Sequence, residues 1–243
     1  MSHVTVHLWR VPTAAVPLAV ARMAADRWLL RGTPGLTFSK LLGTGDGRTL
    51  SPRDADPRTW GLVAAWQRAE DAVAFEAHRT PRGWRRIAEE EWRADLACQR
   101  TRGRWSGREP FTAREDLRGW DGPVVSLTRA RLRPRTAATF WRAVPPVVAD
   151  LEAGPQPLLR VGIGEAPIGV QGTLTLWRAA ADLEAFAYRR GPHRRAIADT
   201  TRLDWYGEEL FARFALLGVR GTVSQVSTTS PVGTAPGRGD LRA

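Results

Sequence analysis

Two stretches of this sequence, residues 66–82 and 177–193, match one another at a constant offset of 111 residues. Trp, Asp, Phe, Arg and Pro recur at equivalent positions, but the last position holds Arg82 in the first stretch and His193 in the second. A lone histidine is able to ligate haem iron, because the porphyrin supplies the four equatorial ligands. The mismatch predicts one metal site on a symmetric scaffold, at His193. A histidine that caps a helix or packs in a core is the alternative.

The residues beside His193 suit a haem site. Pro192 fixes the backbone just before the start of a predicted helix, which orients the imidazole. Arg194 and Arg195 follow directly, and haem propionates need cations. His193 is therefore the candidate metal ligand, and Arg194 and Arg195 are candidate cofactor-binding residues.

Other metal and nucleophile chemistry finds little support. His3 and His7 have an HxxxH spacing, but they fall on a predicted strand, where four residues span about 13 Å, so a zinc or non-haem iron site is not indicated. His78 adds no such spacing, and no GxSxG elbow occurs. Cys98 is the only cysteine, which excludes an internal disulfide and a multi-thiolate cluster. A single thiolate at Cys98 is an alternative iron ligand.

The hydrophobic patterns predict two units with the order β-α-β-β-α-β, which is the ferredoxin-like arrangement. The first unit has predicted strands at 4–11, 35–43, 60–66 and 97–104, and helices at 16–30, 70–78 and 83–95. The second has strands at 124–132, 158–164, 172–177 and 216–226, and helices at 136–151, 181–189 and 194–214.

A four-stranded sheet with helices on one face leaves its other face bare, so two such sheets can pack together. The expected fold class is α+β, with tandem ferredoxin-like repeats forming an intramolecular dimeric α+β barrel. We expect the first repeat at 1–105, a linker at 106–122, the second repeat with the haem site at 123–227, and a disordered tail at 228–243, which is small and polar.

The charge composition limits the partners. The net charge is +11, from 36 Lys and Arg against 25 Asp and Glu, but Lys40 is the only lysine and the arginines form no basic block. We therefore expect no nucleic-acid partner, whereas peripheral contact with anionic lipid or an acidic protein fits this balance.

No apolar run approaches the roughly 20 residues of a spanning helix, and no signal-like pattern opens the chain, so we expect a cytoplasmic protein. The 11 tryptophans suit core anchors or an apolar pocket.

Five segments carry a resemblance to a known family. They are Phe38-Ser-Lys-Leu-Leu-Gly-Thr-Gly45, Gly103-Arg-Trp-Ser-Gly-Arg-Glu-Pro-Phe111, Val161-Gly-Ile-Gly-Glu165, Gly191-Pro-His193 and Trp205-Tyr-Gly-Glu-Glu-Leu-Phe-Ala-Arg-Phe214. Together they resemble the spheroidene monooxygenase family, over about residues 9–217. The combination of Gly-Arg-Trp-Ser-Gly with a downstream Gly-Pro-His is the specific part of this match.

The resemblance implies a haem-dependent monooxygenase that oxidises an activated C–H of a carotenoid or similar apolar small molecule to a hydroxyl or ketone. It implies haem b as cofactor, molecular oxygen as co-substrate, and an external electron donor, for which we expect a ferredoxin. His193 then matches the axial ligand, and Trp105 is expected to line the cofactor pocket.

Cleavage of the O–O bond needs a proton donor or cation near the oxygen. The candidate catalytic residues are Lys40, Arg104, Ser106 and Arg108. For Arg104 and Arg108 the alternative is a propionate anchor or a linker residue, and for Lys40 a structural ion pair.

Three other functions stay open at this stage. A haem enzyme of this kind could modify a different small molecule in a specialised-metabolite pathway. A haem carrier or sensor without turnover is a second alternative, and a cofactor-free monooxygenase is a third, since ferredoxin-like barrels also host those.

Overall fold

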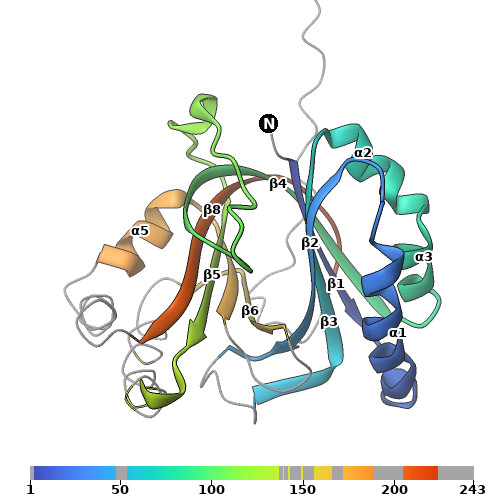
Figure 1. Cartoon of the computed structure of the whole chain (residues 1–243). Helices are drawn as coiled ribbons and strands as arrows, with labels where there is room; N and C mark the ends of the chain where they lie inside the picture. The colour runs from blue at the N-terminus through green and yellow to red at the C-terminus, as the bar shows by residue number, and fades with distance from the viewer. Residues whose placement is uncertain are drawn as a thin grey trace, which may run out of the picture.

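Figure 1 shows the computed structural model of the chain, which describes residues 3–47, 54–136, 156–165, 172–188 and 205–223, together with positions 139, 142 and 149. The first half contains β1 (His3–Arg10), η1 (Thr13–Ala15), α1 (Val16–Leu29), β2 (Leu36–Gly45), β3 (Ala55–Trp66), α2 (Ala69–Ala74), η3 (Phe75–Ala77), α3 (Arg79–Arg85) and β4 (Glu90–Gly103). The second half contains η4 (Glu115–Leu117), β5 (Val124–Leu132), η5 (Pro134–Thr136), β6 (Leu159–Gly164), β7 (Gly172–Trp177), α5 (Ala180–Tyr188) and β8 (Tyr206–Gly221).

The strands close into one barrel in the order β1-β3-β2-β6-β7-β5-β8-β4, and every neighbouring pair is antiparallel. Each half contributes four neighbouring strands in the ferredoxin-like order, β4-β1-β3-β2 and β8-β5-β7-β6. The halves meet where β4 pairs with β8 and β2 with β6. The predicted α+β barrel is confirmed. The repeat and its boundaries stay predictions, because most of 136–151 and all of 228–243 lie outside the described residues.

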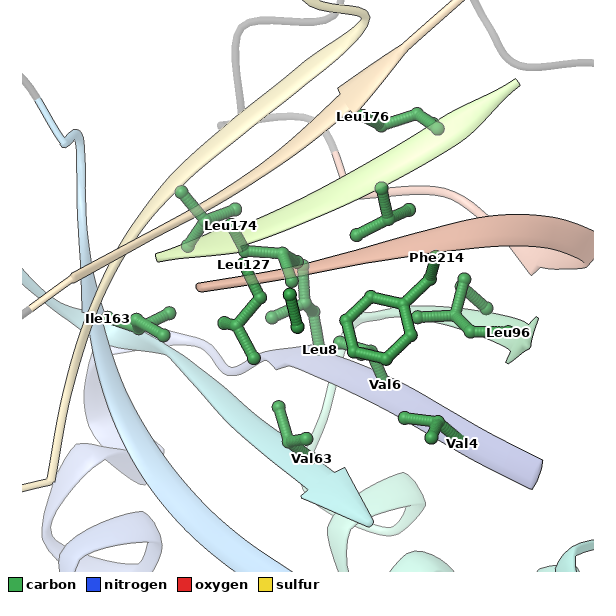
Figure 2. Packing of buried hydrophobic residues seen from close by; sticks show 14 of the residues in the cluster. Val4, Val6, Leu8, Val63, Leu96, Leu127, Ile163, Leu174, Leu176 and Phe214 are labelled. Carbon is green, nitrogen blue, oxygen red and sulfur yellow. The ribbon is translucent and has the colours of Figure 1, made fainter. Parts of the chain in front are cut away.

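The barrel interior is a packed apolar core (Figure 2). Side chains alternate along each strand between the interior and the outer face. Val4, Val6 and Leu8 of β1 point inward, and Leu127 of β5 and Phe214 of β8 meet them from the other half. The two halves therefore share one hydrophobic interior.

Helices α1, α2 and α3 cover the outer face of the first-half sheet (Figure 1). Trp9 stacks on Trp84 of α3 with ring centroids 5.3 Å apart, and Trp66 lies 4.8 Å from Phe75. All four side chains are buried, so these tryptophans act as core anchors. Among the described helices, none has the length and hydrophobicity needed to cross a membrane.

Two predicted helices are wrong in part. The helix at 83–95 is replaced by the end of α3 and by β4, and the helix at 194–214 is replaced from position 206 onward by β8. The residues Glu, Leu, Ala and Arg favour a helix locally. In β8, however, every second residue is buried, as at Leu210, Ala212 and Phe214, which is the pattern of a strand. Because β8 pairs with β4 and β5, sheet pairing outweighs the local preference.

The shared interior predicts how the chain unfolds. Phe214→Ala removes a fully buried ring at the junction of β8 with β4 and β5, and should lower the free energy of unfolding by about 3–5 kcal/mol. Chemical denaturation should still show one transition. Leu217→Ala, on the same strand but exposed, should cost less than about 0.5 kcal/mol. Two separate transitions would show that the halves fold independently.

Candidate functional site

Charged side chains close one end of the barrel interior. Lys40 of β2, Arg129 of β5, Glu165 directly after β6, and Glu208 of β8 each occupy the inward phase of their strand, since residues two positions away belong to the barrel core. We call these four side chains the end cluster. Arg129 is only 2% exposed, and a charge buried this deeply requires carboxylate partners.

Glu165 collects donors from three directions. Its Oε1 accepts from Arg129 Nε at 3.0 Å, from Arg129 Nη2 at 2.6 Å and from Trp105 Nε1 at 2.9 Å. Its Oε2 accepts from Lys40 Nζ at 2.8 Å, while Arg129 Nη1 donates to Glu208. Burial alone would raise the pKa of Glu165, but the hydrogen bond from Lys40 and the charge of Arg129 outweigh it, and this pKa lies below its usual value.

Glu208 holds a tight turn against the end cluster. Trp105 and Arg108 form a β-bridge around Ser106 and Gly107, whose φ angles of 54° and 74° lie in the left-handed region. The backbone N–H groups of Ser106 and Gly107 donate to Glu208 Oε1 at 3.0 Å and Oε2 at 2.7 Å. Burial would raise the pKa of Glu208, but these donors and Arg129 lower it.

An open pocket of about 370 Å³ lies beside this turn. Its wall combines cations and three hydroxyl side chains with apolar side chains from the end of α1 and the start of β2: Arg27, Leu30, Arg31, Gly32, Leu36, Thr37, Phe38, Ser39, Lys40, Ser106 and Arg108. We call it the basic pocket. Because it joins charge to an apolar wall, its lining suits an amphipathic anion.

The structure brings together three of the four predicted catalytic residues. Lys40, Ser106 and Arg108 line the basic pocket, and Lys40 Nζ donates to Ser106 Oγ at 2.6 Å. Arg104 lies apart from them, because its exposed side chain pairs with Glu109 at 3.5 Å. Ser106 accepts a hydrogen bond from the ammonium of Lys40, which is a donor, so this pair does not form a nucleophile with its base.

The outer faces of the two sheets can be compared position by position. In the first half His3 lies opposite Trp66, and in the second Val124 lies opposite Trp177. The two tryptophans occupy equivalent places in the matched stretches. With these tryptophans superimposed, each residue of β1 has an equivalent in β5, and each residue of β7 has one in β3. Pairing of β2 with β3 and of β6 with β7 extends the equivalence to β2 and β6.

At four positions on its outer face the second-half sheet carries smaller side chains than the first. At the positions of His7 and Trp9 in β1, strand β5 has Thr128 and Ala130. In the first half this histidine and tryptophan stack with ring centroids 5.1 Å apart and fill the layer beneath the helices. Strand β5 therefore lacks the two aromatic rings that β1 contributes to this layer.

The neighbouring strands repeat this difference. At the positions of Leu41 and Leu62, strands β6 and β7 have Gly162 and Thr173. Arg160, which is buried, occupies the same face of β6. We call the surface formed by Thr128, Ala130, Gly162 and Thr173 the small-residue face. Helix α5 packs beside it, with Phe186 stacked on Trp177 at 5.5 Å.

Comparison with curated proteins decides the family. The chain is 34% identical to spheroidene monooxygenase of Rhodobacter capsulatus over 212 residues, which cover 86% of this chain and 88% of that protein. It is 35% identical to spheroidene monooxygenase of Rubrivivax gelatinosus, covering 87% of this chain and 80% of that protein.

The chain belongs to the spheroidene monooxygenase family. No protein-family model matches the sequence. Among solved structures, chlorite dismutase from Candidatus Nitrospira defluvii is 11% identical over 88% of this chain and 91% of that chain, with a TM-score of 0.28. This likeness is too low to support any statement about ligand or mechanism.

The predicted haem residues of this spheroidene monooxygenase family member are only partly described. His193, Arg194 and Arg195 lie outside the described residues. Trp105 is buried at the barrel end, where its indole N–H bonds to Glu165, and so it lies on the interior side of the sheet. Its role in cofactor binding stays a prediction.

The other potential iron ligands are already engaged or enclosed. His3 Nε2 lies 3.0 Å from Asp95, and His78 Nδ1 accepts from the Thr80 N–H at the start of α3. His7 is fully buried in the first-half aromatic layer, and burial, with nearby arginines, lowers its pKa to about 3. Burial raises the pKa of Cys98 to about 12, so its thiol stays protonated and is a poor iron ligand.

Sequence reasoning missed three members of the end cluster. Arg129, Glu165 and Glu208 were not among the predicted site residues, although Arg129 follows Val125 and Leu127 at the inward phase of one strand. A charge on the apolar phase of a strand is the signal that could have found it. The same signal marks Glu165 and Glu208, since Ile163 and Leu210 two positions away belong to the core. That these carboxylates pair with Arg129 could not be found in this way, because they lie on other strands.

The end cluster predicts an acid-sensitive stability. The lowered pKa values of Glu165 and Glu208 mean that their contribution is fully present above the unfolded carboxyl pKa of about 4.3. It is lost as the pH falls through the lower folded-state values. Glu165→Gln should cost about 3 kcal/mol at pH 7, since it leaves Arg129 without its main partner.

Denaturation curves of the Glu165→Gln variant from neutral to acid pH test this. The variant should also lose part of the acid dependence of the wild type. Glu109→Gln, an exposed control whose side chain also pairs with an arginine, should change both quantities little. Equal stability of the Glu165→Gln variant and the wild type at pH 7 would contradict the assigned role of the cluster.

Proposed function

We propose that this chain is a haem-dependent monooxygenase that oxidises an activated C–H of a carotenoid or similar apolar small molecule to a hydroxyl or ketone. Family membership supports the reaction class. The main support for a bound haem is the small-residue face, because the first half has bulky residues at the four equivalent positions.

The small-residue face fits a planar group between sheet and helices. Replacing Trp9, His7 and two leucines by Ala, Thr, Gly and Thr frees the layer in which side chains would otherwise pack. A bound planar group would take up the volume that the larger side chains fill in the first half. Arg160 on the same face offers a buried cation for a propionate.

The available histidines also fit a ligand from the second half. His3, His7 and His78 have the environments described above, which leaves His193 as the candidate. It lies five residues after the end of α5, and α5 packs on β5 and β7. An extended chain spans about 17 Å over five residues, which brings His193 within reach of the small-residue face.

When bound, haem b would supply the activation of molecular oxygen, with electrons from an external donor, proposed to be a ferredoxin. The chain would contribute the axial imidazole of His193, cations of Arg160, Arg194 and Arg195 for the propionates, and an apolar enclosure for the substrate. The end cluster lies on the opposite side of the same sheet. The proposal therefore gives Lys40, Ser106 and Arg108 no direct part in the reaction, and none to the outlying Arg104.

The absorption spectrum of the purified chain tests the cofactor. Protein produced with a haem precursor should show a Soret band, and His193→Ala should abolish it while far-ultraviolet circular dichroism is unchanged. Arg82→His, at the equivalent position of the first half, should leave one haem per chain, because the layer beneath the first-half helices is filled by Trp9 and Trp84.

Three outcomes would contradict this proposal. Colourless wild-type protein that still oxidises substrate would mean a cofactor-free monooxygenase. Tightly bound haem with no oxygen consumption under any reductant would mean a carrier. A Soret band that survives His193→Ala would remove His193 as the ligand.

A space-filling substitution tests the location. Gly162→Leu restores the side chain of the first half on the small-residue face and should reduce haem occupancy at least about tenfold, because haem and leucine compete for one space. Gly218→Leu, where an added side chain meets nothing within 4 Å, is the matched control and should keep full occupancy. Haem content per folded chain is the measurement, and unchanged occupancy in Gly162→Leu would place the haem elsewhere.

A further inference from the structure

Helix α1 presents an apolar face to the outside of the protein. Its exposed residues are Pro17, Leu18, Val20, Ala21, Ala24, Ala25, Arg27, Trp28 and Leu29, of which only Arg27 is charged. Six large apolar side chains are exposed in the described part of the chain, and four of them are on this one helix: Leu18, Val20, Trp28 and Leu29. Trp28 is 67% exposed. At 3.6 residues per turn, Leu18, Trp28 and Leu29 share one face of the helix, with Ala21 and Ala25 between them. Scattered exposed residues need no explanation, but a group on one face marks an interaction surface.

Two of the three charged residues of α1, Arg22 and Asp26, lie on its inner side. Asp26 is 1% exposed and accepts from Arg22 Nη2 at 3.1 Å, and the same guanidinium donates to the Thr80 carbonyl beside α3 at 3.2 Å. The usual arrangement of a surface helix, with charge outside and apolar residues inside, is therefore partly reversed. An interfacial helix with its apolar side turned outward has this arrangement.

The basic pocket adjoins the C-terminal end of this apolar face. Arg27 and Arg31 line it from α1 and the turn that follows, and Arg108 lines it from the opposite side. None of these three arginines has a carboxylate partner among the described residues, whereas Lys40 is neutralised by Glu165 at 2.8 Å. The Arg31 guanidinium lies 3.8 Å from the ring centroid of Trp28, which joins the cationic rim to the apolar face.

We propose that α1 docks flat on an anionic membrane, with Leu18, Trp28 and Leu29 in the boundary between headgroups and acyl chains and a lipid phosphate in the basic pocket. A tryptophan beside arginines suits this boundary, and anionic lipids attract surface arginines. The net charge of +11 acts in the same direction. For a haem oxygenase of apolar substrates, the surface would explain how substrate is taken from lipid, although docking itself does not depend on haem.

A second copy of the chain suits this face less well. A 14-residue helix is about 21 Å long, and its exposed side is about 10 Å wide, giving roughly 200 Å². A stable protein interface buries about 800 Å² on each partner. The three arginines, which have no carboxylate partner among the described residues, would also repel their symmetry mates, whereas they attract lipid phosphates.

Vesicle co-sedimentation of the full chain tests the proposal. Wild type should bind vesicles of phosphatidylcholine with phosphatidylglycerol better than vesicles of phosphatidylcholine alone. The double variant Leu18→Gln with Trp28→Gln should lower binding at least about tenfold, through loss of buried apolar area. Arg31→Gln and Arg108→Gln should each lower binding about fivefold, only on anionic vesicles, with the effect fading as salt rises.

Matched controls separate docking from general surface effects. Val73→Gln with Leu217→Gln removes two exposed apolar side chains from other surfaces, and Arg118→Gln removes an exposed arginine elsewhere. These controls should bind vesicles as the wild type does, and circular dichroism should show all variants folded.

Two results would overturn the proposal. One is vesicle binding that is absent in wild type or unchanged in the Leu18→Gln and Trp28→Gln variant. The other is a wild-type dimer in sedimentation velocity that this variant converts to a monomer, since a second copy would then cover α1. The Soret band is read separately, so loss of haem with intact vesicle binding counts against the proposed function alone.

Discussion

Burial of Arg129 inside the barrel is the interaction on which the rest of the structure depends. A guanidinium that is 2% exposed is tolerated only because Glu165 and Glu208 meet it from two sides. These two carboxylates also hold Lys40 of the first half and the backbone of the turn at Ser106. One buried charge thus ties together the barrel end, the link between the halves and the wall of the basic pocket.

The two halves share a strand order, yet their outer faces differ in side-chain volume. In the first half, aromatic rings from β1 and α3 fill the layer between sheet and helices. In the second half, alanine, threonine and glycine stand at the equivalent places. Because backbone pairing is indifferent to side-chain size, the barrel tolerates large side chains at these positions in one half and small ones in the other. The proposed haem site would depend on this difference in side-chain volume.

The two proposed sites lie on different surfaces of the molecule. The small-residue face is on the second-half sheet, whereas the apolar face of α1 is on the first half. A membrane surface and a reaction chamber impose opposite demands, since one needs exposed apolar side chains and the other an enclosed layer. Separating them on two halves of one barrel meets both demands at once.

The sequence by itself determined the local periodicities, the family and the fold class. Alternation in β1 and β5, the matched tryptophan stretches and the Gly-Arg-Trp-Ser-Gly segment were readable without coordinates. It misjudged β4 and β8, because Glu, Leu, Ala and Arg favour a helix until two neighbouring strands compete for their backbone. Only the tertiary structure decided that Lys40 pairs with Glu165, 125 residues away, and that α1 turns its apolar side outward. Both features depend on which strands and helices pack together in the closed barrel. The spacing of residues along the sequence does not contain this information.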